Sequence, residues 1–150
     1  MRVVLDTNIL IRANPKARGP AREVLEKVVS ANHVLVTSSF LLQEVARVLA
    51  YPRVEMRWRL RPQEVEQYLQ ILASVSEVVA PLSGGPIVLK DIDDDPIIYT
   101  AVAGRADVLC TLDAHFYEEP VQSFCAQQGI KIMDDVELLR LIRSQEERDR

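Results

Sequence analysis

The chain has 150 residues, of which 48% are hydrophobic and 27% are charged, and its formal net charge at pH 7 is −4. This composition fits one globular domain with a hydrophobic core and excludes an intrinsically disordered chain. The acidic net charge gives no overall attraction for nucleic acid. Binding of a polyanion therefore requires a local basic patch or bridging cations.

The longest apolar runs are too short for a transmembrane helix, so no membrane association is expected. The N-terminus lacks the long apolar region of a signal peptide. Cys110 and Cys125 show no metal-type spacing, and we interpret both as reduced core thiols of a cytoplasmic protein.

Short apolar runs alternate with segments of helical periodicity along the whole chain. We expect strands over 2–5, 33–37, 76–80, 106–113 and 130–133, and helices from near Ile9, over 22–31, 40–50, 62–75, 97–103 and 121–128, and from Asp134 onward. This alternation predicts a three-layer α/β/α fold around a central, mostly parallel sheet. We expect one domain over 1–143 and a charged tail over 144–150 that frays.

Asp6, Thr7 and Asn8 directly follow the first predicted strand. In open α/β sheets, sites form outside the carboxyl ends of the strands, so Asp6 is a candidate site residue. An Asp at this point is also common as an Asx turn or as the N-cap of a following helix.

Glu44 is the only acidic residue of the predicted helix 40–50, and it falls on or beside the apolar stripe. A carboxylate in that place is costly unless it has a partner. An ion pair with Arg47, one turn on, and ligation of a metal both remain open.

Four arginines surround the only tryptophan in the segment 53–61, after the helix break at Tyr51-Pro52. They form a basic and aromatic patch of Arg53, Arg57, Trp58, Arg59 and Arg61. Arginine and an aromatic ring together bind phosphates and stack bases, and they equally suit a protein interface. The alternative is a solvated helix face with the tryptophan in the core.

Asp91, Asp93, Asp94 and Asp95 crowd into five positions immediately before Pro96. Proline suits the first turn of a helix, so Asp94 or Asp95 lies near a helix N-cap. So many like charges repel one another unless a positive charge neutralises them. The alternative is a solvated acidic loop.

The strand predicted over 106–113 repeats the first pattern, since it ends in Thr111 and Asp113. In a parallel sheet these acids can converge with Asp6 at one edge, and Glu44 can point to the same place. Converging carboxylates require a counter-charge, and ligation by oxygen alone favours Mg²⁺ or Mn²⁺ over Zn²⁺. Such a site suits hydrolysis of phosphodiester bonds.

In order and spacing, the motifs Val3–Leu10, Leu42–Leu49, Asp91–Asp94 and Thr111–Asp113 resemble the successive acidic motifs of PIN-domain nucleases, from Met1 to about Leu139. The chain looks most like the VapC-like toxins of bacterial and archaeal toxin–antitoxin pairs. The resemblance implies a metal-dependent endoribonuclease that cleaves RNA, forms a homodimer and is restrained by an antitoxin protein.

Carried over position by position, the resemblance implies a Mg²⁺ or Mn²⁺ site with the catalytic ligands Asp6, Glu44, Asp94 and Asp113. Asp95 replaces Asp94 if the alignment shifts by one residue. Asn8 and Thr111 match supporting polar positions, Thr111 by hydrogen-bonding a carboxylate and Asn8 by fixing the loop. The 53–61 patch is expected to bind RNA or the antitoxin. The loop Leu112–His115 lacks the Gly, Arg or Lys common in this family, and His115 is interpreted as a surface residue.

The same sequence features bear on three other functions. A haloacid-dehalogenase-like phosphatase needs a second Asp where this chain has Asn8, and the acceptor Asp and the Lys of a receiver domain are not placed convincingly. The remaining alternative is a PIN scaffold that serves as a nucleic-acid or protein interaction module with weak or no catalysis.

Overall fold

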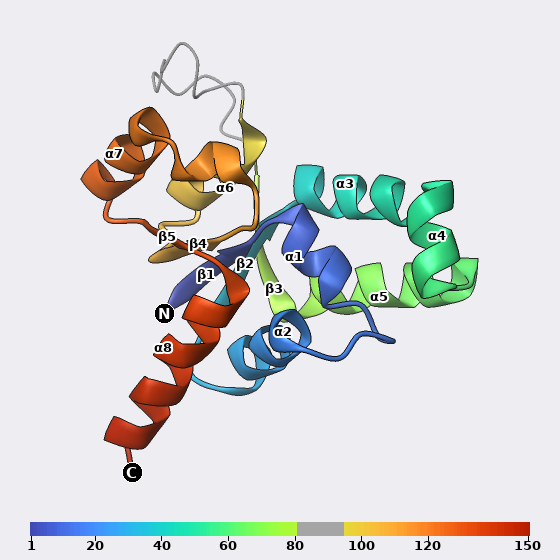
Figure 1. Ribbon diagram of the computed structural model, residues 1–150, viewed down its shortest axis with the longest axis horizontal. Helices are drawn as coiled ribbons and strands as arrows, with labels where there is room; N and C mark the ends of the chain where they lie inside the picture. The colour runs from blue at the N-terminus through green and yellow to red at the C-terminus, as the bar shows by residue number, and fades with distance from the viewer. Residues whose placement is uncertain (81–94) are drawn as a thin grey trace.

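The structure, a computed structural model, describes residues 1–80 and 95–150 (Figure 1). The described strands are β1 (Arg2–Leu5), β2 (Val34–Ser38), β3 (Ser76–Val79), β4 (Val108–Cys110) and β5 (Lys131–Met133). They form one five-stranded sheet in the order β3-β2-β1-β4-β5, and each neighbouring pair is parallel. The predicted parallel α/β sheet is confirmed.

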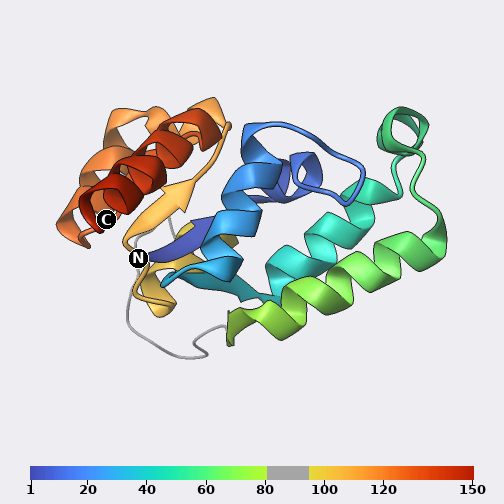
Figure 2. The ribbon, with the colours of Figure 1, turned by 90° about the horizontal axis from the view of Figure 1, so that it is seen from below.

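Helices cover both faces of this sheet (Figures 1 and 2). They are α1 (Thr7–Arg12), α2 (Pro20–Ser30), α3 (Ser39–Leu49), α4 (Pro52–Trp58), α5 (Pro62–Val75), α6 (Pro96–Ala103), the 3₁₀ turn η1 (Ala114–Tyr117), α7 (Glu119–Gln127) and α8 (Asp135–Arg148). Because side chains alternate along a strand, Val3 and Leu5 pack with α1, α2 and α8, whereas Val4 packs with α6 and α7. Two hydrophobic cores therefore sandwich the sheet and complete the predicted three layers.

Local capping explains why several helices begin where the sequence predicts. The Ser38 hydroxyl accepts a hydrogen bond from the Leu41 amide at the start of α3. Asp134 and Glu137 form a capping box on α8. Pro62 and Pro96 occupy first turns, where the missing N–H is no loss.

Strand β4 is shorter than the predicted span 106–113. The Asp113 amide donates to Thr111 Oγ1 at 3.0 Å, and the His115 amide donates to Asp113 Oδ1 at 3.0 Å. These local bonds turn the chain into η1 directly after Cys110, so Thr111 and Asp113 follow the strand end instead of extending the strand.

Helices α3, α4 and α5 form an arm that extends beyond the sheet, with α4 at its far end (Figure 2). Val45 and Leu49 of α3 and Tyr68 and Leu72 of α5 are buried in the same core cluster. Because the segment of four arginines and Trp58 lies in α4 and directly after it, this segment is at the end of the arm away from the sheet.

The charged tail belongs to the last helix, because α8 continues to Arg148. Lys27 of α2 pairs with Glu146 at 2.9 Å, and Glu23 pairs with Arg143 at 2.6 Å. These ion pairs lie along the contact between α2 and α8. The tail is thus helical to Arg148, and both its fraying and the domain boundary at 143 stay predictions.

Cys110 and Cys125 are both buried free thiols, as predicted. Among the residues that the structure describes, no helix is both long enough and apolar enough to cross a bilayer.

Tyr68 ties the arm to the helix that follows β1, because its buried hydroxyl donates to the Leu10 carbonyl at 2.6 Å. Tyr68→Phe should lower the free energy of unfolding by about 1 kcal/mol, the net value of a typical hydrogen bond. Urea denaturation measures this change. Tyr51→Phe, at a side chain that is 47% exposed, is the control and should leave stability unchanged. Equal stability of the two variants would contradict the assigned bond.

Candidate active site

Asp6 lies at the carboxyl end of the central strand β1, and its side chain is only 5% exposed. Both carboxylate oxygens accept hydrogen bonds. Oδ1 accepts from the Thr7 amide at 2.7 Å, and Oδ2 accepts from the Thr111 hydroxyl at 2.6 Å. Asp6 is thus the N-cap of α1, the structural alternative considered above, and it also bridges the ends of two adjacent strands.

Asn8 and Thr111 connect this carboxylate to the loop after β4. Asn8 Nδ2 donates to Asp6 Oδ2 at 3.3 Å, and Asn8 Oδ1 accepts from the Leu112 amide at 3.2 Å. The contacts expected of Thr111 and Asn8 are present, and their role in supporting a metal ligand stays a prediction. The loop that carries Asp113 is therefore fixed relative to Asp6.

Two further acids cap helical segments at the same edge of the sheet. Asp95 is half-buried and accepts from the Ile97 amide at 3.0 Å as the N-cap of α6. Asp113 is exposed and caps η1. Of the two candidates for the α6 cap, the structure selects Asp95, whereas Asp94 lies outside the described residues together with Asp91 and Asp93.

The charges of these acids act on one another. Burial raises the pKa of the Asp6 carboxyl, hydrogen bonds from Thr111 and Thr7 oppose that rise, and the charges of Asp95 and Asp113 add to it. Burial also raises the pKa of the Asp95 carboxyl, to which the Asp113 charge contributes. Negative charge at this edge is therefore held without full compensation by the described residues.

An open cleft of about 510 Å³ begins at Asp6, a volume within the range of ligand sites. Its lining comes from β1, α1, α3, α4 and the loop after β4, and comprises Asp6, Thr7, Asn8, Ile11, Arg12, Glu44, Val48, Arg57, Trp58, Leu112 and Asp113. Residues far apart in the chain, among them three of the predicted acids, thus share one concave surface.

Glu44 is half-buried on α3, and its carboxylate has no ion-pair partner among the described side chains. The ion pair with Arg47, one of the two alternatives that the sequence left open, is not formed. A half-buried carboxylate without a cation, beside a cleft that already holds Asp6 and Asp113, remains a candidate metal ligand.

The acidic side chains of the cleft fit a hard divalent cation, because Asp6, Glu44 and Asp113 offer only oxygen. Their spacing does not form a complete ligand set by itself. Over residues 1–80 and 95–150, no three side chains of His, Cys, Asp or Glu lie close enough together to hold one metal ion. The structure thus provides acidic donors around one cleft but not a closed metal shell.

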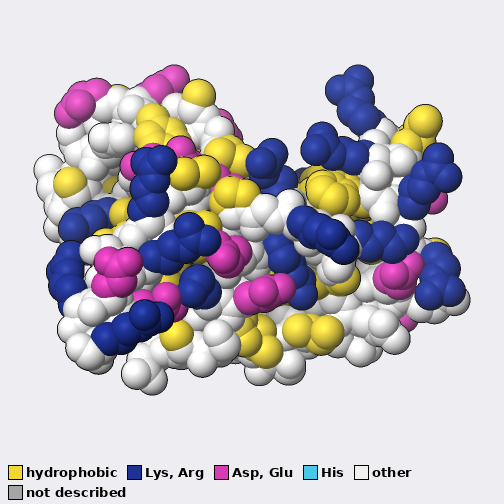
Figure 3. All heavy atoms as spheres, turned by 60° about the horizontal axis from the view of Figure 1, so that its bottom comes forward, with side chains coloured by type: hydrophobic (Ala, Val, Ile, Leu, Met, Phe, Trp, Pro, Cys, Tyr) yellow, Lys and Arg dark blue, Asp and Glu magenta, His cyan; other side chains and the backbone are white. Residues whose placement is uncertain are grey.

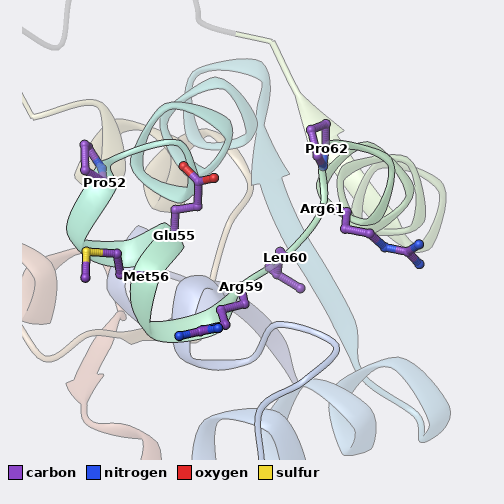
Figure 4. Close-up of a pocket in the computed structure, with 7 residues that line it drawn as sticks. All are labelled: Pro52, Glu55, Met56, Arg59, Leu60, Arg61 and Pro62. Carbon is purple, nitrogen blue, oxygen red and sulfur yellow. The ribbon is translucent and has the colours of Figure 1, made fainter.

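The basic and aromatic patch divides between two places. Arg57 and Trp58 line the acidic cleft, and the Arg57 Cζ lies 5.2 Å from the centroid of the indole ring. Arg59 and Arg61 line a second hollow at the turn between α4 and α5, where their guanidinium groups point apart (Figure 4). Arg61 also pairs with Glu64, and Arg53 is exposed and lines neither hollow.

Arg12 and Leu112 line the cleft but were not predicted from the sequence. Arg12 stands four residues after Asn8, so the two share one face of α1, and this spacing could have identified it. Leu112 gives no such signal, because its position depends on the turn after β4.

Two comparisons with known proteins bear on this site. Residues 2–115 match the family model described as the PIN domain. The comparison with curated proteins found no match.

The raised pKa of Asp6 gives stability a pH dependence in the absence of metal. Below pH 3.8, the ordinary value, the carboxyl is protonated in both the folded and the unfolded state. As pH rises above 3.8, the unfolded state loses its proton first. The folded state keeps its proton to a higher pH. The free energy of unfolding therefore falls as pH rises from 3.8 through the raised pKa of the folded state.

Asp6→Asn has no carboxyl group to ionise at this position, so it does not lose this stability as pH rises. In EDTA, its melting temperature relative to that of the wild type should therefore rise with pH above 3.8. Each pKa unit of elevation corresponds to about 1.4 kcal/mol at neutral pH. Thermal melts from below pH 3.8 to neutral pH measure this, with the exposed Gln67→Ala, which changes no titrating group, as the control. A pH-independent difference between Asp6→Asn and the wild type would show that the Asp6 pKa is not raised.

Proposed function

Since the chain belongs to the PIN-domain family, whose members are generally nucleases, we propose that it is a metal-dependent endoribonuclease that hydrolyses RNA phosphodiester bonds. The observation that carries the proposal is Asp6. It is a buried carboxylate at the end of the central strand, with both oxygens held, and it opens into a cleft that Glu44 and Asp113 also line.

PIN nucleases generally use divalent metals, and we propose Mg²⁺ or Mn²⁺ here. The proposed ligands are Asp6, Glu44, Asp94 and Asp113, with Asp95 beside them. A divalent cation in such a site lowers the pKa of water and neutralises charge that develops on a phosphate. Asp95 caps α6 with one oxygen, and its charge raises the pKa of the Asp6 carboxyl, so a bound cation would relieve the repulsion between the two acids.

The supporting residues act by restricting Asp6 and Asp113. Thr111 donates to Asp6 and accepts from the Asp113 amide, so one hydroxyl fixes both acids relative to each other. Asn8 holds the intervening Leu112 amide. A carboxylate kept in one orientation loses little entropy when it binds a cation, and outer contacts of this kind typically change metal affinity or activity 10- to 100-fold.

We further propose that the protein is a VapC-like toxin that acts in the cytoplasm, forms a homodimer and is restrained by an antitoxin protein. Its two free buried cysteines suit a reducing compartment. Apolar side chains exposed along the arm support the dimer, namely Phe40 at 41%, Ile71 at 56% and Val75 at 37% exposure.

The alternative is an interaction module with weak or no catalysis. It is favoured by one observation, that the carboxylates of the described residues do not by themselves form a complete metal shell. Cleavage measurements separate the two functions.

A mixed pool of single-stranded RNA should be cleaved by the wild type with Mn²⁺ or Mg²⁺ and not in EDTA. Asp6→Asn, Glu44→Gln and Asp94→Asn should each lower the rate by about 100-fold or more, because even supporting contacts contribute 10- to 100-fold. Electrophoresis of the products measures the rate and reads the cleavage sequence.

Glu66→Gln, at an exposed acid of α5 outside the cleft, is the matched control and should keep full activity. Equal cleavage by all variants, or cleavage that persists in EDTA, would show that the acidic site is not responsible. Binding of RNA without cleavage would favour the interaction module.

The homodimer can be tested through the exposed face of α5. Ile71→Glu should convert a dimer into a monomer, because a charge would be buried at the interface, while the exposed position leaves the fold intact. Light scattering measures the mass, and Gln70→Glu is the neighbouring control. A monomeric wild type would disprove the dimer.

A further inference from the structure

The lining of the cleft at Asp6 includes two chemically different groups of side chains. Asp6, Glu44 and Asp113 are acidic, whereas Arg12 and Arg57 are basic and Trp58 is aromatic. The acidic group accounts for the proposed cation. The second group has a different chemistry, and the proposed reaction does not use it.

Trp58 is held firmly enough to serve as a platform. It is half-buried and packs against the core cluster that contains Tyr68 and Leu72. The next residue, Arg59, adopts a left-handed conformation with φ of 51°, and the Lys16 ammonium donates to its carbonyl at 2.6 Å. Leu60 is then buried. The indole is therefore anchored behind and open on the side of the cleft.

The indole ring already accepts a planar group. The Arg57 Cζ lies 5.2 Å from its centroid, and Arg57 is exposed. Within the described part of the chain, neither Arg57 nor Arg12 forms an ion pair. An exposed guanidinium such as that of Arg57 is bound weakly by an aromatic ring, whereas a base stacked on an aromatic ring is bound more strongly. A nucleobase can thus take this place and leave both arginines free for phosphates.

Charge and shape around the cleft favour a nucleic-acid strand. Figure 3 shows Lys and Arg side chains around hydrophobic ones at the end of the molecule formed by α4 and α5. An aromatic platform beside cations binds an unpaired base with its phosphate. A base inside a duplex has both faces covered by its neighbours and cannot use such a platform.

We propose that Trp58, Arg57 and Arg12 form a subsite that stacks one unpaired nucleobase and binds its phosphates, and so positions a single strand across the acids of the cleft. The inference rests on the proposed nuclease function and adds the residues that hold the substrate. Trp58 is a positioning residue in this assignment, because it contacts a base and not the phosphate that reacts.

The test compares two ligands of equal length and charge, a short oligouridylate and an oligomer of the same backbone without bases, each labelled with fluorescein. Every protein carries Asp6→Asn, so that the strand stays intact, and anisotropy is measured in Mg²⁺. The base-containing strand should bind Asp6→Asn at least about ten-fold more tightly than the base-free strand. Trp58→Leu should abolish this difference, and Trp58→Phe should keep most of it.

Two further readouts do not depend on those variants. Trp58 is the only tryptophan, so its fluorescence should change with oligouridylate and not with the base-free strand. Arg57→Gln and Arg12→Gln should weaken both ligands, whereas Arg140→Gln, at an exposed arginine of α8 outside the cleft, should weaken neither.

Equal binding of the two ligands, or unchanged tryptophan fluorescence, would overturn the stacking subsite. The failure of the nuclease proposal gives a different result, because binding is measured without cleavage. A strand that binds with the expected base preference but is not cut by the wild type would overturn the catalytic assignment and leave the subsite standing.

Discussion

The hydrogen bond from Thr111 to Asp6 is the contact on which the rest of the site depends. It joins the ends of β1 and β4, two adjacent parallel strands, through a carboxylate that is almost completely buried. A buried charge of this kind is tolerated only where polar partners meet it, and here Thr7, Asn8 and Thr111 do so. The same bonds direct the loop after β4 toward the cleft. The hydrogen bonds that oppose the effect of burial on the pKa of the Asp6 carboxyl therefore belong to the same network that fixes the loop carrying Asp113.

The negative charges of Asp6 and Asp95 are not fully compensated by the residues around them. The raised pKa of Asp6 and of Asp95 shows that hydrogen bonds do not fully offset burial and mutual charge. Sites with this imbalance are typical of functional centres, where a ligand supplies the missing charge. The membership of the chain in the PIN-domain family gives this imbalance a chemical context, since PIN nucleases generally use divalent metals.

Features set by local chemistry were predictable from the sequence. Pro62, Pro96 and Asp134 mark helix starts through their own backbone and side-chain preferences, and the structure has helices at all three. The sequence could also have distinguished between Asp94 and Asp95 as the N-cap of α6. Proline at the first helical position makes the preceding residue the cap, which is Asp95.

Features set by contacts between distant segments were not predictable. Only the fold brings Leu112 and Trp58 to one surface, and only the fold separates Arg59 and Arg61 from it. The contact of α8 with α2 likewise joins distant segments, through the pairs of Lys27 with Glu146 and of Glu23 with Arg143. A pattern read along one helix contains no information about these partners.

The arm separates the proposed subsite from the contacts that hold Asp6. Glu44 lies midway along α3, whereas Trp58 ends α4, at the far end of the arm from the sheet (Figure 2). The hydrogen bonds of Asp6 come instead from Thr7, Asn8 and Thr111, at the ends of β1 and β4. A substitution at the end of the arm leaves all three bonds in place. The sequence of α4 can therefore diverge, and with it the strands that are bound, while the acids keep their arrangement.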